Sequence, residues 1–120
     1  MIEIHVFDRS RDKQAVAADT VLFRAGDPGA AMFAIIEGEF EVIVDDEVVE
    51  VIGAGGIVGE MALIDHAPRS ATVRARTDGV VVAVEEPQFL FLVDEHPTFA
   101  LQVMRTMAER LRHRSHTHAT

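Results

Sequence analysis

Short stretches of alternating apolar and polar residues run through the first two thirds of the chain. Such alternation is typical of half-buried strands. The predicted strands span residues 2–7, 20–24, 31–37, 39–44, 48–52, 70–76 and 80–84. Turn-forming residues separate them roughly every 8 to 12 positions, and the pair Asp78-Gly79 is expected to close a hairpin. A chain of about eight such strands predicts a double-stranded β-helix, or jelly roll.

Some polar and glycine-rich segments invite a binding-loop interpretation but are better explained as connections. Asp45-Asp46-Glu47 lacks the ligand spacing of a calcium loop, so we expect a solvated hairpin turn. Gly53-Ala54-Gly55-Gly56 is not followed by the long helix of a dinucleotide-binding unit, which favours a sharp turn. Residues 8–14 mix acidic and basic side chains and predict a polar connection or a weak helical turn.

The pattern changes to a helical period in the last third of the chain. A short apolar helix is predicted around residues 89–93, and it should end before Pro97. A longer helix begins at Thr98, and its predicted apolar face contains Ala100, Val103, Met104, Met107 and Leu111. This face could also form a homodimer contact. We expect one domain over residues 1–114 and a disordered tail over 115–120, where His116 and His118 lack a third metal ligand.

Composition restricts the class of partner. The 120 residues carry a net charge of −9, and no residue is a cysteine, which excludes disulfides and thiolate metal sites. From Arg105 onward the local charge is +3, which leaves −12 for residues 1–104. Such an acidic body argues against direct nucleic-acid binding. The sequence has neither a membrane-spanning apolar run nor a secretion signal, so we expect a cytoplasmic protein that contacts no membrane.

The candidate chemistry lies in residues 59–75, GEMALIDHAPRSATVRA, where Glu60 and Arg69 stand nine positions apart. A helical turn that begins near Glu60 presents free N–H groups and a positive dipole end to an anion. The planar guanidinium of Arg69 suits two phosphate oxygens, and Ser70 adds a hydroxyl. Glu60 is an acceptor for sugar hydroxyls when ionised. A ligand with one phosphate and a neighbouring ribose hydroxyl satisfies all of these groups.

This segment resembles, without gaps, the phosphate-binding cassette of the cyclic nucleotide-binding domain family. Upstream, FRAGDPGAAMFAIIEGEFEV is similar to the strand and glycine pattern of the same family, so the resemblance covers residues 21–111. It implies a jelly roll with a short helical turn in the cassette and two C-terminal helices. It also implies a non-catalytic sensor that binds cAMP or cGMP and needs no metal or other cofactor.

The resemblance assigns roles to particular residues. It implies that Glu60 binds the ribose 2′-hydroxyl and that Arg69 pairs with the cyclic phosphate. The rest of the ligand cradle then consists of backbone groups and one side chain, at Gly59, Met61, Ala62 and Ser70. In the family the last helix contacts the base, which makes Met104 and Arg105 candidate base contacts. The choice between cAMP and cGMP stays open.

Other functions remain open as alternatives. A jelly-roll enzyme of the cupin type needs inward histidines and a carboxylate on strands, whereas His5, His66 and His96 are isolated, and the chain has no G-x-S-x-G motif. The domain could be the ligand-binding part of a longer transcription regulator. It could also be a degenerate roll that mediates protein contacts, although the presence of Glu60 and Arg69 favours ligand binding.

Overall fold

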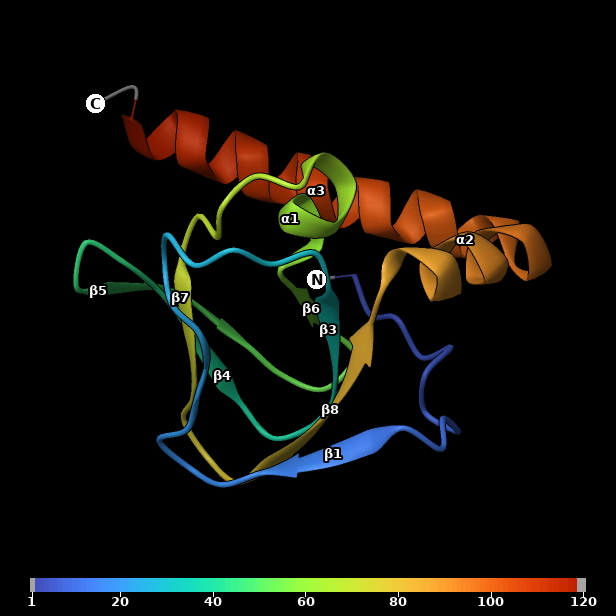
Figure 1. The fold of residues 1–120 in the computed structure, drawn as a ribbon. Helices are drawn as coiled ribbons and strands as arrows, with labels where there is room; N and C mark the ends of the chain where they lie inside the picture. Colours follow the sequence, from blue (N-terminus) through green and yellow to red (C-terminus); the bar gives the residue numbers. More distant parts are fainter. Residues whose placement is uncertain (1, 119–120) are drawn as a thin grey trace.

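A computed structural model describes residues 2–118, with the side chains of residues 2–113 (Figure 1). Within this range the chain forms two four-stranded antiparallel sheets, ordered β1-β8-β3-β6 and β2-β7-β4-β5. The strands are β1 Lys13–Val16, β2 Val21–Phe23, β3 Met32–Glu37, β4 Phe40–Val44, β5 Glu47–Ile52, β6 Ile57–Val58, β7 Thr72–Ala75 and β8 Gly79–Val84. The helices are α1 Glu60–Asp65, α2 Glu86–Glu95 and α3 Pro97–His118. The predicted jelly roll with C-terminal helices is confirmed.

Strand β8 carries buried residues on both of its faces. Val81 packs in the core between the two sheets, whereas Val82 and Val84 pack in a second core under the helices. Residues on both faces of β8 therefore need apolar side chains, which explains the unbroken apolar run at 80–84. Figure 1 shows α3 lying across the end of the roll, with α1 beside it. No helix within residues 2–118 is both long and apolar enough to cross a membrane.

The strand predicted at residues 2–7 is wrong. Ile4 and Phe7, three positions apart, are the buried residues there, and Phe7 packs edge-on against Phe99 of α3 at 5.5 Å between ring centroids. The segment is held instead by the Ile4 N–H, which donates to the carbonyl of Gly55 at 2.6 Å. The first strand is β1, Lys13–Val16. It begins within the polar connection predicted at residues 8–14 and extends beyond it. Its side chains are largely exposed at the sheet edge, so no apolar alternation marks it.

The hairpin predicted at Asp78-Gly79 is also wrong. β7 pairs with β2 and β4, whereas β8 pairs with β1 and β3, so the chain crosses here from one sheet to the other. The turn at Asp45-Asp46 does close a hairpin, between β4 and β5, and both residues have positive φ angles of 52° and 66°. The two-residue strand β6 carries too short a pattern to be predicted.

The buried face of α3 is rotated from the predicted one. Phe99 and Val103 are each 1% exposed and Thr106 is buried, whereas Met104 is 56% and Leu111 52% exposed. Thr106 is tolerated there because its hydroxyl donates to the carbonyl of Gln102 at 3.0 Å. α3 carries the backbone to His118, and residues 119 and 120 lie outside the described part, so the disordered tail stays a prediction. The homodimer contact stays a prediction as well.

Candidate functional site

The chain enters the cassette through a left-handed glycine. Gly59 has a φ of 77° and precedes the six-residue helix α1, which confirms the predicted helical turn. A side chain at this position would be strained, because left-handed backbone suits glycine. A Cβ atom would also come within 2.5 Å of Nη1 of Arg69. The turn therefore allows the backbone and the guanidinium to approach each other closely.

Backbone hydrogen bonds fix the position of Arg69. Its N–H donates to the carbonyl of Asp27 at 2.9 Å, and its carbonyl accepts from the N–H of Gly26 at 2.8 Å. The side chain is buried, with the residue 7% exposed, and its guanidinium lies 4.1 Å from the ring centroid of Phe23. Nη1 donates to the carbonyl of Gly59 at 3.3 Å. Nε is buried and has no hydrogen-bond partner among the described residues.

The charge of Arg69 is poorly compensated by the protein. Burial lowers the pKa of Arg69, and attraction to the carboxylate of Asp27 opposes this shift. Arginine nevertheless stays charged in proteins. No ion pair to Arg69 is formed by the described residues. A buried charge with a missing partner is unfavourable, so an anion placed beside Arg69 is stabilised there.

Glu60, which is predicted to bind the ribose, is hydrogen-bonded to Arg110 of α3. Nη1 of Arg110 donates to Oε1 of Glu60 at 2.5 Å, and Nη2 donates to the carbonyl of Ile57 at 2.6 Å. Nε lies 3.4 Å from Oε1 of Glu50. The side chains of Arg110 and Glu60 are only 12% and 5% exposed, so this ion pair is largely shielded from water.

Sequence reasoning missed Arg110 and placed the base contact nearby. Met104 and Arg105 are exposed and line neither of the cavities at the site, so their role in base binding stays a prediction. One signal could have identified Arg110. It continues the buried stripe of α3 that runs through Phe99, Val103 and Thr106, at steps of four and three residues. A charged residue on such a stripe needs a buried partner.

Two adjoining cavities lie at this site in the described part of the chain. The smaller, of about 110 Å³, is lined by residues that include all six predicted cradle positions: Gly59, Glu60, Met61, Ala62, Arg69 and Ser70. The larger, of about 880 Å³, lies between the β4–β5 hairpin and α3. Glu50, Ser70 and Arg110 line both cavities. The structure thus brings the cassette residues together and connects them to a second, larger space.

Comparison with known proteins identifies the family. The family model described as the cyclic nucleotide-binding domain matches residues 13–96. The chain is a cyclic nucleotide-binding domain. The resemblance carried by the cassette is therefore confirmed at the level of the family. The match covers all strands of both sheets together with α1 and α2, and it leaves out the N-terminal segment and α3.

Relatives of this domain occur within longer proteins. The cyclic nucleotide-gated potassium channel of Rhizobium etli is 39% identical over 102 residues, which are 85% of this chain and 28% of the channel. The catabolite activator protein of Thermus thermophilus has a TM-score of 0.76 at 25% identity, with 86% of this chain and 51% of that one covered. A structure from work on a cyclic-GMP-dependent pathway in bacterial phytopathogenesis has a TM-score of 0.75 at 27% identity, with 91% and 92% covered. The domain spans about a third or less of the first curated relatives.

Proposed function

We propose that this cyclic nucleotide-binding domain is a non-catalytic sensor module that binds cAMP or cGMP. One observation carries the proposal: the buried guanidinium of Arg69 has an Nε with no hydrogen-bond partner among the described residues, and it lines a cavity with the other cassette residues. A single cyclic phosphate supplies the missing acceptor. The relatives named for gating by cyclic nucleotides and for a cyclic-GMP-dependent pathway support this class of ligand.

The ligand is held at its two polar ends. The cyclic phosphate accepts hydrogen bonds from Arg69, from Ser70 and from backbone N–H groups at the start of α1, around Met61 and Ala62. The ribose 2′-hydroxyl donates to Glu60. The side chain of Glu60 is only 5% exposed and its Oε1 already accepts a hydrogen bond from Arg110, so we propose that the ribose reaches this carboxylate by displacing Arg110.

This displacement provides the signal. Displacement of Arg110 removes its hydrogen bond to Glu60, so ligand binding shifts the equilibrium toward positions of α3 in which Arg110 contacts the ligand instead. A ligand changes a conformational equilibrium only through such differential contacts. The segment from α2 onward therefore transmits occupancy of the cassette to whatever partner or domain the helix contacts.

The first experiment is thermal unfolding with excess cAMP, cGMP and, as a control, 5′-AMP. At a concentration a hundredfold above the dissociation constant, one ligand stabilises the folded domain by about 2.7 kcal/mol. This corresponds to a rise in melting temperature on the order of ten degrees for a domain of this size. A rise with a cyclic nucleotide and none with 5′-AMP is expected. The absence of any rise would favour the alternative of a degenerate roll that binds proteins.

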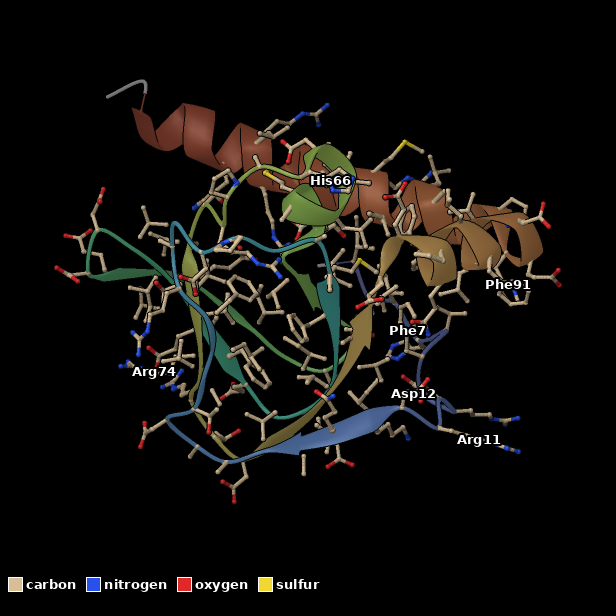
Figure 2. All side chains as sticks on the ribbon, viewed as in Figure 1. Phe7, Arg11, Asp12, His66, Arg74 and Phe91 are labelled. Carbon is tan, nitrogen blue, oxygen red and sulfur yellow. The ribbon has the colours of Figure 1, made fainter. Side chains whose placement is uncertain are left out.

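A pair of arginine variants tests the site itself. Arg69→Ala should weaken ligand binding by about 2 to 5 kcal/mol, because it removes the guanidinium that pairs with the buried cyclic phosphate. Arg74→Ala is the matched control. Arg74 lies on the neighbouring strand β7 but pairs with Glu41 at 3.1 Å, on the outside of the roll (Figure 2). Equal affinities of the Arg69 variant and the parent, measured by calorimetry, would contradict the assignment.

A further inference from the structure

The larger cavity is the space into which a ligand held at Arg69 must extend. Its volume of about 880 Å³ lies near the upper end of the range for small-molecule pockets. It opens from the cassette through Glu50, Ser70 and Arg110, which line both cavities. Figure 1 shows its two walls, the β5 hairpin and the C-terminal half of α3, on the same side of the roll. If the phosphate and ribose occupy the smaller cavity, the base occupies this one.

Carboxylates make up half of the polar side chains that line this cavity in the described part of the chain, and the others are those of Ser70, Thr106, Arg110 and His113. Apolar contact surface for a base comes from Val49, Ile52 and Ile57. Among the described lining residues, the guanidinium of Arg110 is accompanied by four carboxylates, those of Asp45, Glu47, Glu50 and Glu109. An ionised carboxylate can only accept hydrogen bonds. The wall therefore favours a base edge that presents N–H donors and disfavours one that presents ring-nitrogen acceptors.

The edges of the two purines differ in this respect. Guanine presents two adjacent donors, N1–H and the 2-amino group, and on the next edge two adjacent acceptors, O6 and N7. A carboxylate can accept from both donors with its two oxygens, and a guanidinium can donate to both acceptors. Adenine has one amino donor flanked by ring acceptors, so a carboxylate that accepts from this donor also faces an acceptor. The combination of carboxylate and guanidinium is complementary to guanine.

Glu50 places a carboxylate beside a guanidinium in this cavity, since its Oε1 lies 3.4 Å from Nε of Arg110. Glu109 of α3 contributes a second carboxylate to the same lining. When a ribose hydroxyl replaces Arg110 at Glu60, the guanidinium keeps Glu50 as its partner. The resulting pair can then meet the acceptor and donor edges of one base. We propose that Glu50 and Glu109 select guanine, so that cGMP is the preferred ligand; this inference rests on the proposed function.

The test compares three cyclic nucleotides by calorimetry on the whole chain. Inosine 3′,5′-cyclic monophosphate keeps O6, N7 and N1–H but lacks the 2-amino group, so it isolates the contact to that amino group. The parent should bind cGMP about tenfold more tightly than cAMP, the scale of one bidentate contact to a base. It should also bind cGMP several-fold more tightly than the inosine analogue.

Charge-neutral variants identify the residues responsible. In Glu50→Gln combined with Glu109→Gln, the preference for cGMP over cAMP should fall about tenfold, because a glutamine amide pairs well with adenine. The inosine analogue should then bind as well as cGMP. Glu37→Gln is the matched control, since Glu37 is an exposed carboxylate at the end of β3 that lines neither cavity. Melting temperatures without ligand show whether each variant is folded.

The outcomes separate the two proposals. Equal affinity of the parent for cAMP and cGMP, equal affinity for cGMP and the inosine analogue, or an unchanged preference in the double variant would overturn the role of Glu50 and Glu109. In each of these cases the domain still binds a cyclic nucleotide, and the proposed function stands. Absence of binding by all three nucleotides would overturn the proposed function, and the selectivity with it.

Discussion

Arg69 and Arg110 are both largely buried, and both line the smaller cavity, yet the protein treats their charges in opposite ways. Arg110 donates hydrogen bonds through Nη1 to Glu60 and through Nη2 to the carbonyl of Ile57, and its Nε lies within ion-pair distance of Glu50. Arg69 has one hydrogen bond of 3.3 Å to a carbonyl and an Nε without a partner among the described residues. One guanidinium is satisfied by the described residues, and the other is not.

This difference agrees with the proposed roles, which are structural for Arg110 and ligand-binding for Arg69. The bonds of Arg110 tie α3 to the cassette and so stabilise the domain, and under the proposed function they are rearranged when a ribose reaches Glu60. The incomplete bonding of Arg69 costs stability in the empty domain, as binding sites commonly do. We therefore expect that loss of Arg110 mainly lowers the stability of the domain, whereas loss of Arg69 mainly lowers its affinity for the ligand.

The largest expected effect on stability follows from the loss of Arg110. Arg110→Ala leaves Glu60 as a buried carboxylate without its partner, which should reduce the free energy of unfolding by about 3 to 5 kcal/mol. Urea unfolding measures this change. Arg112→Ala, an exposed arginine on the same helix, should change the free energy by less than about 0.5 kcal/mol.

A double-mutant cycle sharpens the same comparison. In a Glu60→Gln background the penalty for Arg110→Ala should become smaller, because the uncompensated charge is no longer present. Equal penalties in both backgrounds would mean that Arg110 stabilises the domain through its contacts to Ile57 and Glu50 rather than to Glu60.

Gly59→Ala should have the next largest effect. The left-handed conformation of Gly59 costs an alanine roughly 1 to 2 kcal/mol of stability, and the added Cβ displaces the guanidinium of Arg69. Gly26 is a matched control, since its φ is 88° and a Cβ there meets no atom within 4 Å. Both variants should lose similar stability in thermal unfolding, but only Gly59→Ala should also lose cyclic-nucleotide affinity. Loss of affinity in both variants would mean that strain in the backbone, and not displacement of Arg69, is responsible.

Arg69→Ala should change the stability of the empty domain by less than about 1 kcal/mol, in either direction. The variant loses packing on Phe23 but also removes a buried charge that lacks a carboxylate partner. The unliganded melting temperature is the measurement. A loss as large as that for Arg110→Ala would show that the fold, and not the ligand, depends on Arg69.

The smallest expected effect concerns His5, an exposed histidine that contacts the carboxylates of Glu3 and Asp8. A hydrogen bond from the ring of His5 to the carboxylate of Glu3 raises the pKa of His5, and Asp8 acts in the same direction. The charged form is favoured in the folded state, so the stabilisation is complete below the unfolded pKa of about 6.5 and disappears as pH rises through the folded value. His5→Gln should remove this small pH dependence of the melting temperature. His96→Gln, which changes another exposed histidine, should not.

The parts of the site that could be predicted from sequence lie close together along the chain. Gly59, Glu60, Arg69 and Ser70 fall within one short segment, and the structure places all of them at the smaller cavity. Arg110 could not be assigned in the same way, since it is 50 residues from Glu60 and its partner depends on how α3 is docked. The carboxylate of Glu50 likewise reaches the cavity only because the β4–β5 hairpin faces α3.

The same division applies to the fold. Local sequence patterns predicted strands β2 to β5, β7 and β8, the helical turn after Gly59 and the two terminal helices, because these follow from periodicity, turn residues and backbone conformation. Tertiary structure alone decided that β7 and β8 lie in different sheets, that Phe7 packs on Phe99, and which face of α3 is buried. Local patterns indicate that one face of an element is buried, but long-range packing decides which other element covers that face. Whether a buried arginine stabilises the fold or awaits a ligand depends on that packing.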